Sequence, residues 1–330
     1  MPPETRRARP PSRPSPNLRP QPSAPSTPPE VVDPAWLASA LALSLVAALF
    51  CAWLTVCLLF YQGEWQLILR PTQTIDQTPA SANLAYEPLR FDASETGQPR
   101  LTAWWLPAAP SPQPTSQPTF QPTPKYAAFT VLYLHDGSLS LSATVPALAR
   151  LHQAGLNVFA IDYRGFGLSD ASAHPSEARM AQDTAAALDY LISTRHIPPS
   201  RIIPYGAGLG ASLAANLALR HPDLPAAILD NPDPDPTPTP LAAHPSRLVP
   251  VRLLFRERFD LALPLRTLAT PKLLIAGGPD SNANRTSALQ ILFRRAASPS
   301  FTVTLPPTHY EADYQTTLTR FLDENLPSTP

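Results

Sequence analysis

The sequence predicts an α/β domain, in which a mostly parallel central sheet is flanked by helices, preceded by a single transmembrane helix. Three observations support this prediction. Strand-like and helix-like segments alternate along most of the 330-residue chain, a pattern typical of parallel sheets covered by helices. An uncharged apolar segment precedes them. The 45 prolines cluster outside the alternating segments, where their fixed φ and missing N–H indicate extended linkers.

The chain begins with a tail and a membrane-spanning candidate. Residues 1–34 are rich in proline and arginine, and we expect them to be disordered. Residues 36–61 contain no charged side chain, and about 20 apolar residues suffice to cross a bilayer. We therefore expect a transmembrane helix over residues 35–61, with the lipid bilayer as its partner. A signal peptide fits less well, because its apolar region is shorter, about 7–15 residues.

Arginines indicate the orientation of this helix. Five lie within residues 6–19, whereas the first twenty residues after the helix carry only Arg70. The positive-inside rule then predicts a cytoplasmic N-terminus and a main domain on the far, extracytoplasmic side. Cys51 and Cys57 both fall inside the apolar segment, so the main domain is expected to contain no disulfide.

The main domain is expected to cover residues 62–327, with a proline-rich insertion at 107–124 and a reduced cap at 231–260. Strands are predicted at Leu84–Phe91, Leu101–Leu106, Phe129–Leu134, Asn157–Asp162, Arg201–Tyr205, Ala226–Asp230, Lys272–Gly277 and Phe301–Leu305. Helices are predicted at Leu141–Ala154, Ser176–Thr194, Leu209–Leu219, Asn284–Ala296 and Tyr310–Asn325. The run Phe129–Leu134 is apolar on both faces, as in a buried central strand. No helix separates the first two strands, which are expected to form an antiparallel edge.

Composition narrows the classes of partner. The formal net charge is zero, which argues against an electrostatic nucleic-acid binder. The acidic run after Asp230 alternates with prolines that splay its carboxylates apart, so we expect no metal site there. No cofactor is expected either.

The string YGAGLGAS, residues 205–212, has two interpretations. Gly206, Gly208 and Ala211 fit the dinucleotide pattern G-x-G-x-x-G/A, with Asp230 about twenty residues on, where an acid would bind ribose. The same string fits the hydrolase turn G-x-S-x-G with glycine in place of the serine. The turn follows the fifth predicted strand, and no second βαβ unit follows it, which favours the hydrolase turn.

Several strings resemble the α/β-hydrolase superfamily, and more narrowly its membrane-anchored, bud emergence protein-like branch. The most specific is NVFAIDYRGFGLS at residues 157–169. Others are YQGEWQLILRP at 61–71, VLYLHDG at 131–137 and PKLLIAGGPD at 271–280. The resemblance covers about residues 61–326.

The resemblance implies a catalytic triad in the chain order serine, acid, histidine. Asp280 stands at the acid position and His309 at the histidine position. Gly208 stands at the nucleophile position, where it has no atom that attacks. His135, Asp136 and Leu209 belong to the oxyanion loop and pocket. A carboxylate at position 136 would oppose a developing negative charge, unless the loop is a shifted turn whose carboxylate faces solvent.

We therefore expect a membrane-anchored α/β-hydrolase-like protein that is catalytically impaired and serves a binding or scaffold role. A small-molecule ester, acyl or peptide ligand is the expected partner, and the sequence identifies no protein partner. The alternative is a weak hydrolase in which His309 and Asp280 activate water directly. A remote alternative is dinucleotide binding at Gly206–Ala211.

Overall fold

The computed structural model describes residues 33–92, 99–108, 124–172, 174–234, 249–250, 254–278 and 283–327. Three predictions lie wholly or mostly outside these residues: the tail at 1–34, the insertion at 107–124 and most of the cap at 231–260. The chain divides into two compact units, Met1–Leu54 and Thr55–Pro330. The predicted domain boundaries stay predictions.

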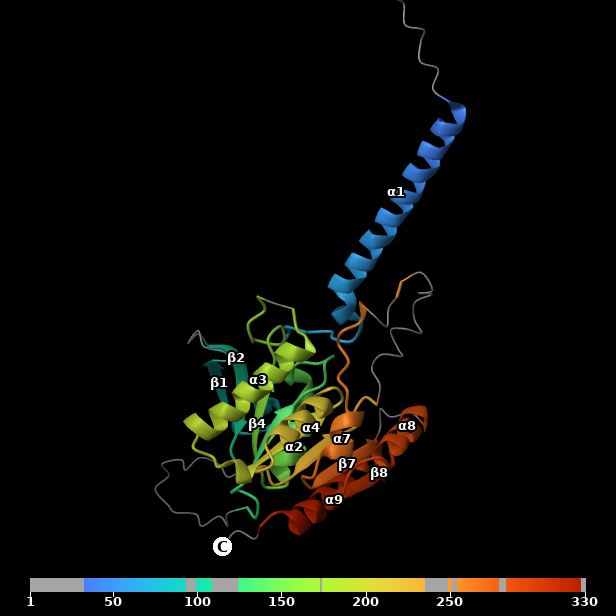
Figure 1. Cartoon of the computed structure of the whole chain (residues 1–330). Helices are drawn as coiled ribbons and strands as arrows, with labels where there is room; N and C mark the ends of the chain where they lie inside the picture. Colours follow the sequence, from blue (N-terminus) through green and yellow to red (C-terminus); the bar gives the residue numbers. More distant parts are fainter. Residues whose placement is uncertain are drawn as a thin grey trace, which may run out of the picture. The chain divides into compact units, whose positions relative to one another are not determined.

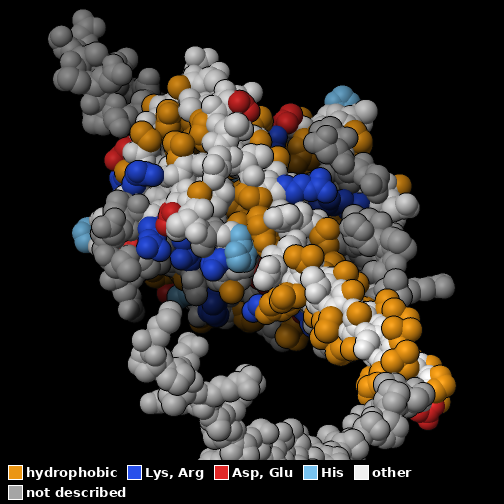
Figure 2. Space-filling view, turned by 90° about the horizontal axis from the view of Figure 1, so that it is seen from above, with side chains coloured by type: hydrophobic (Ala, Val, Ile, Leu, Met, Phe, Trp, Pro, Cys, Tyr) orange, Lys and Arg blue, Asp and Glu red, His pale blue; other side chains and the backbone are white. Residues whose placement is uncertain are grey.

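The apolar segment forms one helix, α1 (Pro34–Gly63). Its most apolar 18-residue window has a mean hydropathy of 2.5, and only 6% of that window is buried. Its surface is largely hydrophobic, as the orange rod in Figure 2 shows. Such exposure does not fit the core helix of a soluble domain. By length and composition α1 is a candidate membrane span, and its orientation stays a prediction.

The main domain is built on one eight-stranded sheet (Figure 1). The strand order is β1-β2-β4-β3-β5-β6-β7-β8. The strands are β1 (Glu87–Asp92), β2 (Pro99–Leu106), β3 (Thr130–Leu134), β4 (Asn157–Asp162), β5 (Ile202–Ala207), β6 (Ala227–Asp230), β7 (Lys272–Gly277) and β8 (Ser300–Leu305). Strand β2 pairs antiparallel with β1 and β4, and the remaining pairs are parallel. All eight predicted strands and the antiparallel edge are confirmed.

The predicted helices are also present. The last one, Tyr310–Asn325, has the predicted bounds, and the other four have shifted ends. The five predicted helices are α2 (Val145–Gln153), α3 (Glu177–Asp189), α4 (Gly210–Arg220), α8 (Ala283–Phe293) and α9 (Tyr310–Asn325). A 3-10 turn, Leu141–Thr144, precedes α2, and a π-helical turn, Tyr190–Thr194, follows α3. The short helix α7 (Ala262–Thr267) was not predicted, because six residues with an internal proline carry too little periodicity to detect.

The sheet separates two hydrophobic cores. Side chains of α3, α4, α7 and α8 pack on one face and side chains of α2 and α9 on the other. Every residue of β3 is buried, because its successive side chains alternate between the cores. Leu132 and Leu134 belong to the first core, and Val131 and Tyr133 to the second. The prediction of a buried central strand is therefore confirmed.

Two glycines let α4 approach the sheet closely. A Cβ added to Gly206 would lie 2.3 Å from the carbonyl oxygen of Gly210 and 2.4 Å from Cα of Ala211. A Cβ on Gly210 would lie 2.2 Å from the carbonyl oxygen of Leu134. Backbone packing therefore accounts for both glycines without a bound dinucleotide.

The substitution Gly206→Ala tests this packing. We expect it to lower the free energy of unfolding by about 1–3 kcal/mol, since the new methyl group overlaps backbone atoms that cannot rotate away. Thermal unfolding of the full chain in a neutral detergent measures the loss. The control is Gly63→Ala, where nothing lies within 4 Å of the added Cβ. Equal effects of the two substitutions would contradict the close approach.

Candidate functional site

The candidate site centres on the turn between β5 and α4. Gly208 has φ of +55°, a left-handed conformation that favours glycine. Its N–H donates to the carbonyl oxygen of Asp230 at 3.0 Å, and its own carbonyl oxygen accepts the N–H of Ala211 at 3.2 Å. These bonds turn the chain directly from the strand into the helix. The segment has the strand–turn–helix form that the hydrolase interpretation requires.

The Asp136 carboxylate lies against this turn. Its Oδ1 accepts the N–H of Leu209 at 2.9 Å, and its Oδ2 accepts the hydroxyl of Ser138 at 2.7 Å. A Cβ added to Gly208 would lie 2.3 Å from Oδ1 and 2.6 Å from Cγ of Asp136. The carboxylate therefore occupies the space that a side chain at position 208 would need. The alternative in which this carboxylate faces solvent is wrong, because the hydrogen bonds direct it onto the turn.

His135 lies beneath the loop and is fully buried. It therefore supports the loop instead of lining an open pocket. Its Nδ1 is 2.7 Å from the carbonyl oxygen of Asp136, and its ring packs against Tyr163 and Phe166. Its Nε2 lies 3.6 Å from Oδ1 of Asp162 and has no hydrogen-bond partner among the described residues.

Burial changes the protonation of this pair in opposite directions. Desolvation lowers the pKa of His135 to about 4. Desolvation raises the pKa of Asp162 to about 7, although the backbone N–H groups that its carboxylate accepts oppose this shift. Between these values both side chains are neutral, so a buried ion pair with its large desolvation cost does not form.

The motif DYRGFGLS, residues 162–169, surrounds the His135–Asp162 pair. Asp162 accepts the N–H of Leu141 at 2.9 Å, which fixes the loop that precedes α2. Arg164 donates from its backbone N–H and from Nε to the buried Asp183, at 2.9 and 2.6 Å. A Cβ on Gly167 would lie 1.9 Å from Asp162. Arg164–Gly167 is thus a packed loop, and the role of Asp162 was not predicted from the sequence.

Of the two other predicted triad members, the structure describes only His309. Asp280 lies outside the described residues. His309 is exposed and stands at the N-cap position of α9 with φ of +65°, where its side chain makes no capping hydrogen bond. The predicted pairing of these two side chains stays a prediction.

Asp230 has a different environment from the one that a ribose-binding acid requires. It is buried and accepts hydrogen bonds from the Tyr205 hydroxyl and the Asn231 amide. The hydroxyl of Tyr314 in turn donates to that of Tyr205 at 3.1 Å. This network ties β5, β6 and α9 together, and it does not favour dinucleotide binding. No group of His, Cys, Asp or Glu suited to a metal ion occurs in the part of the chain that the structure describes.

Sequence comparisons agree with this geometry. A family model described as serine aminopeptidase, S33 matches residues 128–259. An uncharacterized protein of Mycobacterium tuberculosis is 33% identical over 156 residues, which are 47% of this chain and 53% of that protein. An α/β-hydrolase domain-containing protein of Arabidopsis thaliana is 30% identical over 156 residues, with 47% and 45% covered. Protein bem46 of Schizosaccharomyces pombe is 36% identical over 105 residues, with 31% and 34% covered. The chain spans about half or less of the length of these relatives.

Solved structures show the same fold. An esterase of Pyrococcus furiosus aligns with a TM-score of 0.56 at 17% identity, covering 79% of this chain and 99% of that chain. An α/β hydrolase from Vibrio vulnificus aligns with a TM-score of 0.51 at 21% identity, covering 75% and 81%. At these identities the likeness shows the fold alone. The predicted α/β-hydrolase fold is confirmed.

The substitution Asp162→Asn tests the buried pair through the pH dependence of stability. The lowered pKa of His135 means that the unfolded chain binds more protons between pH 4 and 6.5, so this group makes stability rise with pH. The raised pKa of Asp162 means that the folded chain binds more protons between pH 3.8 and 7, so this group makes stability fall with pH. In the native chain the two slopes offset each other.

The Asp162→Asn variant loses only the decrease of stability with pH that Asp162 causes. We expect its free energy of unfolding to gain up to about 1.4 kcal/mol per pH unit between pH 4 and 6.5, relative to the native chain. Denaturant unfolding at several pH values measures the difference. Parallel pH profiles for the two chains would contradict the assigned protonation states.

Proposed function

We propose that this chain, whose fold and sequence resemble the α/β-hydrolase superfamily, is a membrane-anchored member that binds a ligand or partner without acting as a serine hydrolase. The observation that carries the proposal is the Asp136 carboxylate against the turn at Gly208. Two consequences of this position support it, one steric and one electrostatic.

The steric consequence concerns the nucleophile. Glycine at position 208 has no attacking atom, and a serine there would place its Cβ 2.3 Å from Oδ1 of Asp136. Other serines do not take over the role by position. Ser212, the nearest on α4, is buried and donates its hydroxyl to the carbonyl oxygen of Leu209 at 2.9 Å. Nucleophilic acyl transfer at this turn therefore lacks its first step.

The electrostatic consequence concerns the Leu209 N–H. In the family pattern, the residue after the nucleophile supplies an oxyanion donor. Here this N–H already donates to a carboxylate, whose negative charge repels a second anion at the same place. Loss of one oxyanion donor costs about 2.7–4 kcal/mol of transition-state stabilisation in comparable enzymes. The missing nucleophile and the occupied Leu209 N–H both oppose catalysis, so binding is the function that the site supports best.

The anchor and the ligand complete the proposal. Helix α1 supplies the membrane attachment, with the N-terminus in the cytoplasm and the main domain on the other side. Small esters, acyl compounds or peptides are the proposed ligand class at the turn, since the related fold of the Pyrococcus protein belongs to an esterase.

A fluorophosphonate probe, which labels activated serines, tests the absence of serine-hydrolase activity. We expect no labelling of the native chain, and labelling of the double variant Asp136→Gly/Gly208→Ser, because that variant restores both the nucleophile and the space for it. Gel fluorescence after incubation with the probe measures both. The matched control is Asp136→Gly alone, which frees the Leu209 N–H but adds no serine.

Two outcomes would count against the proposal. The first is labelling of the native chain that disappears when another serine, such as Ser138, is replaced by alanine. The second is esterase turnover of the native chain that is lost in His309→Ala, which would support the alternative in which His309 and Asp280 activate water.

The single variant Gly208→Ser tests the steric argument by itself. We expect it to lower the free energy of unfolding by about 1–3 kcal/mol, because the new side chain overlaps Asp136 and the backbone at this position has a positive φ, which disfavours serine. Adding Asp136→Gly should recover part of this loss, and thermal unfolding of the three chains measures it. An additive loss in the double variant would show that the two side chains do not compete for space.

A further inference from the structure

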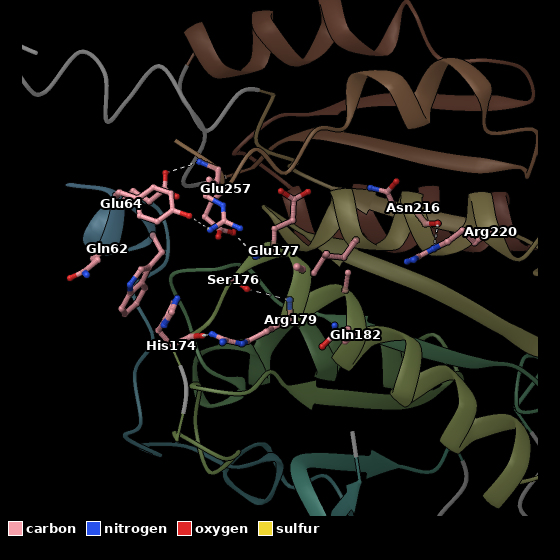
Figure 3. A pocket seen from close by; sticks show the side chains of 16 residues that line it. Gln62, Glu64, His174, Ser176, Glu177, Arg179, Gln182, Asn216, Arg220 and Glu257 are labelled. Atoms are coloured by element: carbon pink, nitrogen blue, oxygen red, sulfur yellow. Dashed lines mark hydrogen bonds between the residues drawn. The ribbon is translucent and has the colours of Figure 1, made fainter. Parts of the chain in front are cut away.

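A large cavity lies away from the turn at Gly208 (Figure 3). Its volume is about 1040 Å³. Its walls come from the last turn of α1, the 3-10 helix that follows it (Glu64–Leu67), the start of α3, the outer side of α4, and residues 256–257. None of the five candidate-site residues that the structure describes (His135, Asp136, Gly208, Leu209 and His309) lines it.

The acidic side chains of this cavity are held by backbone N–H groups. Glu64 accepts the N–H of Arg256 at 2.6 Å. Glu177 accepts the N–H groups of Arg258 and Phe259 at 3.0 and 2.9 Å. Glu257 accepts the N–H of Glu177. The three carboxylates thus join the start of α3 and the first 3-10 helix to the loop at 256–259, and their function is structural.

The basic side chains form no close ion pair with these carboxylates, although the charges of Arg256 and Arg179 act on Glu257 from a longer distance. Arg179, Arg220 and Arg256 form no ion pair within 4.0 Å among the described residues. Arg179 donates to the carbonyl oxygen of His174, Arg220 from Nε to that of Asn216 at 3.2 Å, and Arg256 to the Tyr61 hydroxyl at 2.7 Å. Each guanidinium has five N–H donors, so each keeps donors for a ligand.

Three guanidinium groups line this one cavity, and each attracts the negative charge that a phosphate ester carries. Arginine binds phosphate oxygens through paired N–H donors in a fixed plane. The amides of Gln182 and Asn216 line the same cavity and add neutral hydrogen-bonding groups. We propose that this cavity binds a phosphate ester through Arg179, Arg220 and Arg256.

The place of the cavity in the chain favours a membrane phospholipid as the source of that ester. Tyr61 and Gln62, which line the cavity, lie in the last turn of α1. A helix that spans a bilayer places its end at the level of the lipid head groups. Trp65 stacks on His174 with ring centroids 5.3 Å apart, and with Leu213 it gives the cavity an apolar part suited to a glycerol or acyl group.

Titration of the full chain in neutral detergent tests this proposal. The probes are glycerol 3-phosphate and dihexanoyl phosphatidic acid, with succinate and dihexanoyl phosphatidylcholine as controls for charge alone and for lipid alone. We expect both phosphate monoesters to raise the melting temperature, because a ligand that binds only the folded chain stabilises it. Tryptophan fluorescence, to which Trp65 contributes, gives a second readout.

The two phosphate probes distinguish the source. Binding of phosphatidic acid at least about 10-fold tighter than glycerol 3-phosphate would assign the site to a lipid. Equal affinities would assign it to a soluble phosphate ester. A response to neither probe, or an equal response to succinate, would overturn the proposal.

Substitutions of the cavity arginines test whether these side chains bind the phosphate. Arg179→Gln and Arg220→Gln should each weaken phosphate binding about 10-fold, since each removes one charged donor. The matched control is Arg294→Gln, an exposed arginine outside the cavity, which should bind like the native chain. Equal weakening by the control and the cavity variants would overturn the assignment. Because neither cavity arginine touches the turn at Gly208, the outcome is independent of the probe-labelling result.

Discussion

Space at the turn between β5 and α4 is the constraint on which the candidate site depends. Gly206 and Gly210 bring α4 against the backbone of the sheet, where no Cβ fits. This close approach fixes the direction of the Leu209 N–H, and the Asp136 carboxylate accepts it. A Cβ at position 208 would then overlap this carboxylate unless the Asp136 side chain moved. The backbone contacts of Gly206 and Gly210 therefore set the shape of the turn, and the Asp136 side chain occupies the space at its tip.

The Asp136 carboxylate at this turn lies next to a pair of buried, uncharged side chains. His135, directly before Asp136, is buried beside Asp162, and their opposite pKa shifts leave both uncharged between about pH 4 and pH 7. A protonated His135 would partly neutralise the adjacent carboxylate, but burial disfavours that form. Asp136 therefore receives its stabilisation from the Leu209 N–H and the Ser138 hydroxyl. The loop therefore places this carboxylate directly before the start of α4.

The sequence predicted the sheet well because its strands carry strong local signals. The apolar run at β3 and the motif ending β4 specify buried parallel strands, and both lie where expected. The site was predicted less completely. Asp136 was identified as a departure from the family pattern, but its hydrogen bond with Leu209 joins residues 73 positions apart, and no local periodicity reports such a contact. The cavity at Arg179 and Arg220 was missed for the same reason, since its arginines are ordinary helix residues until the chain folds.

The contact between positions 136 and 208 also couples the residues that these two positions can carry. In a chain with this turn, replacing a side chain at 208 by glycine only removes atoms, and the step meets no clash. An aspartate at 136 in this conformation overlaps any Cβ at 208, so its side chain would have to rotate away if position 208 carried one. With both residues in place, a serine at 208 would displace the Asp136 side chain, and a smaller residue at 136 would remove that conflict. Substitutions at the two positions are therefore coupled, because the side chain that either position accepts depends on the residue at the other.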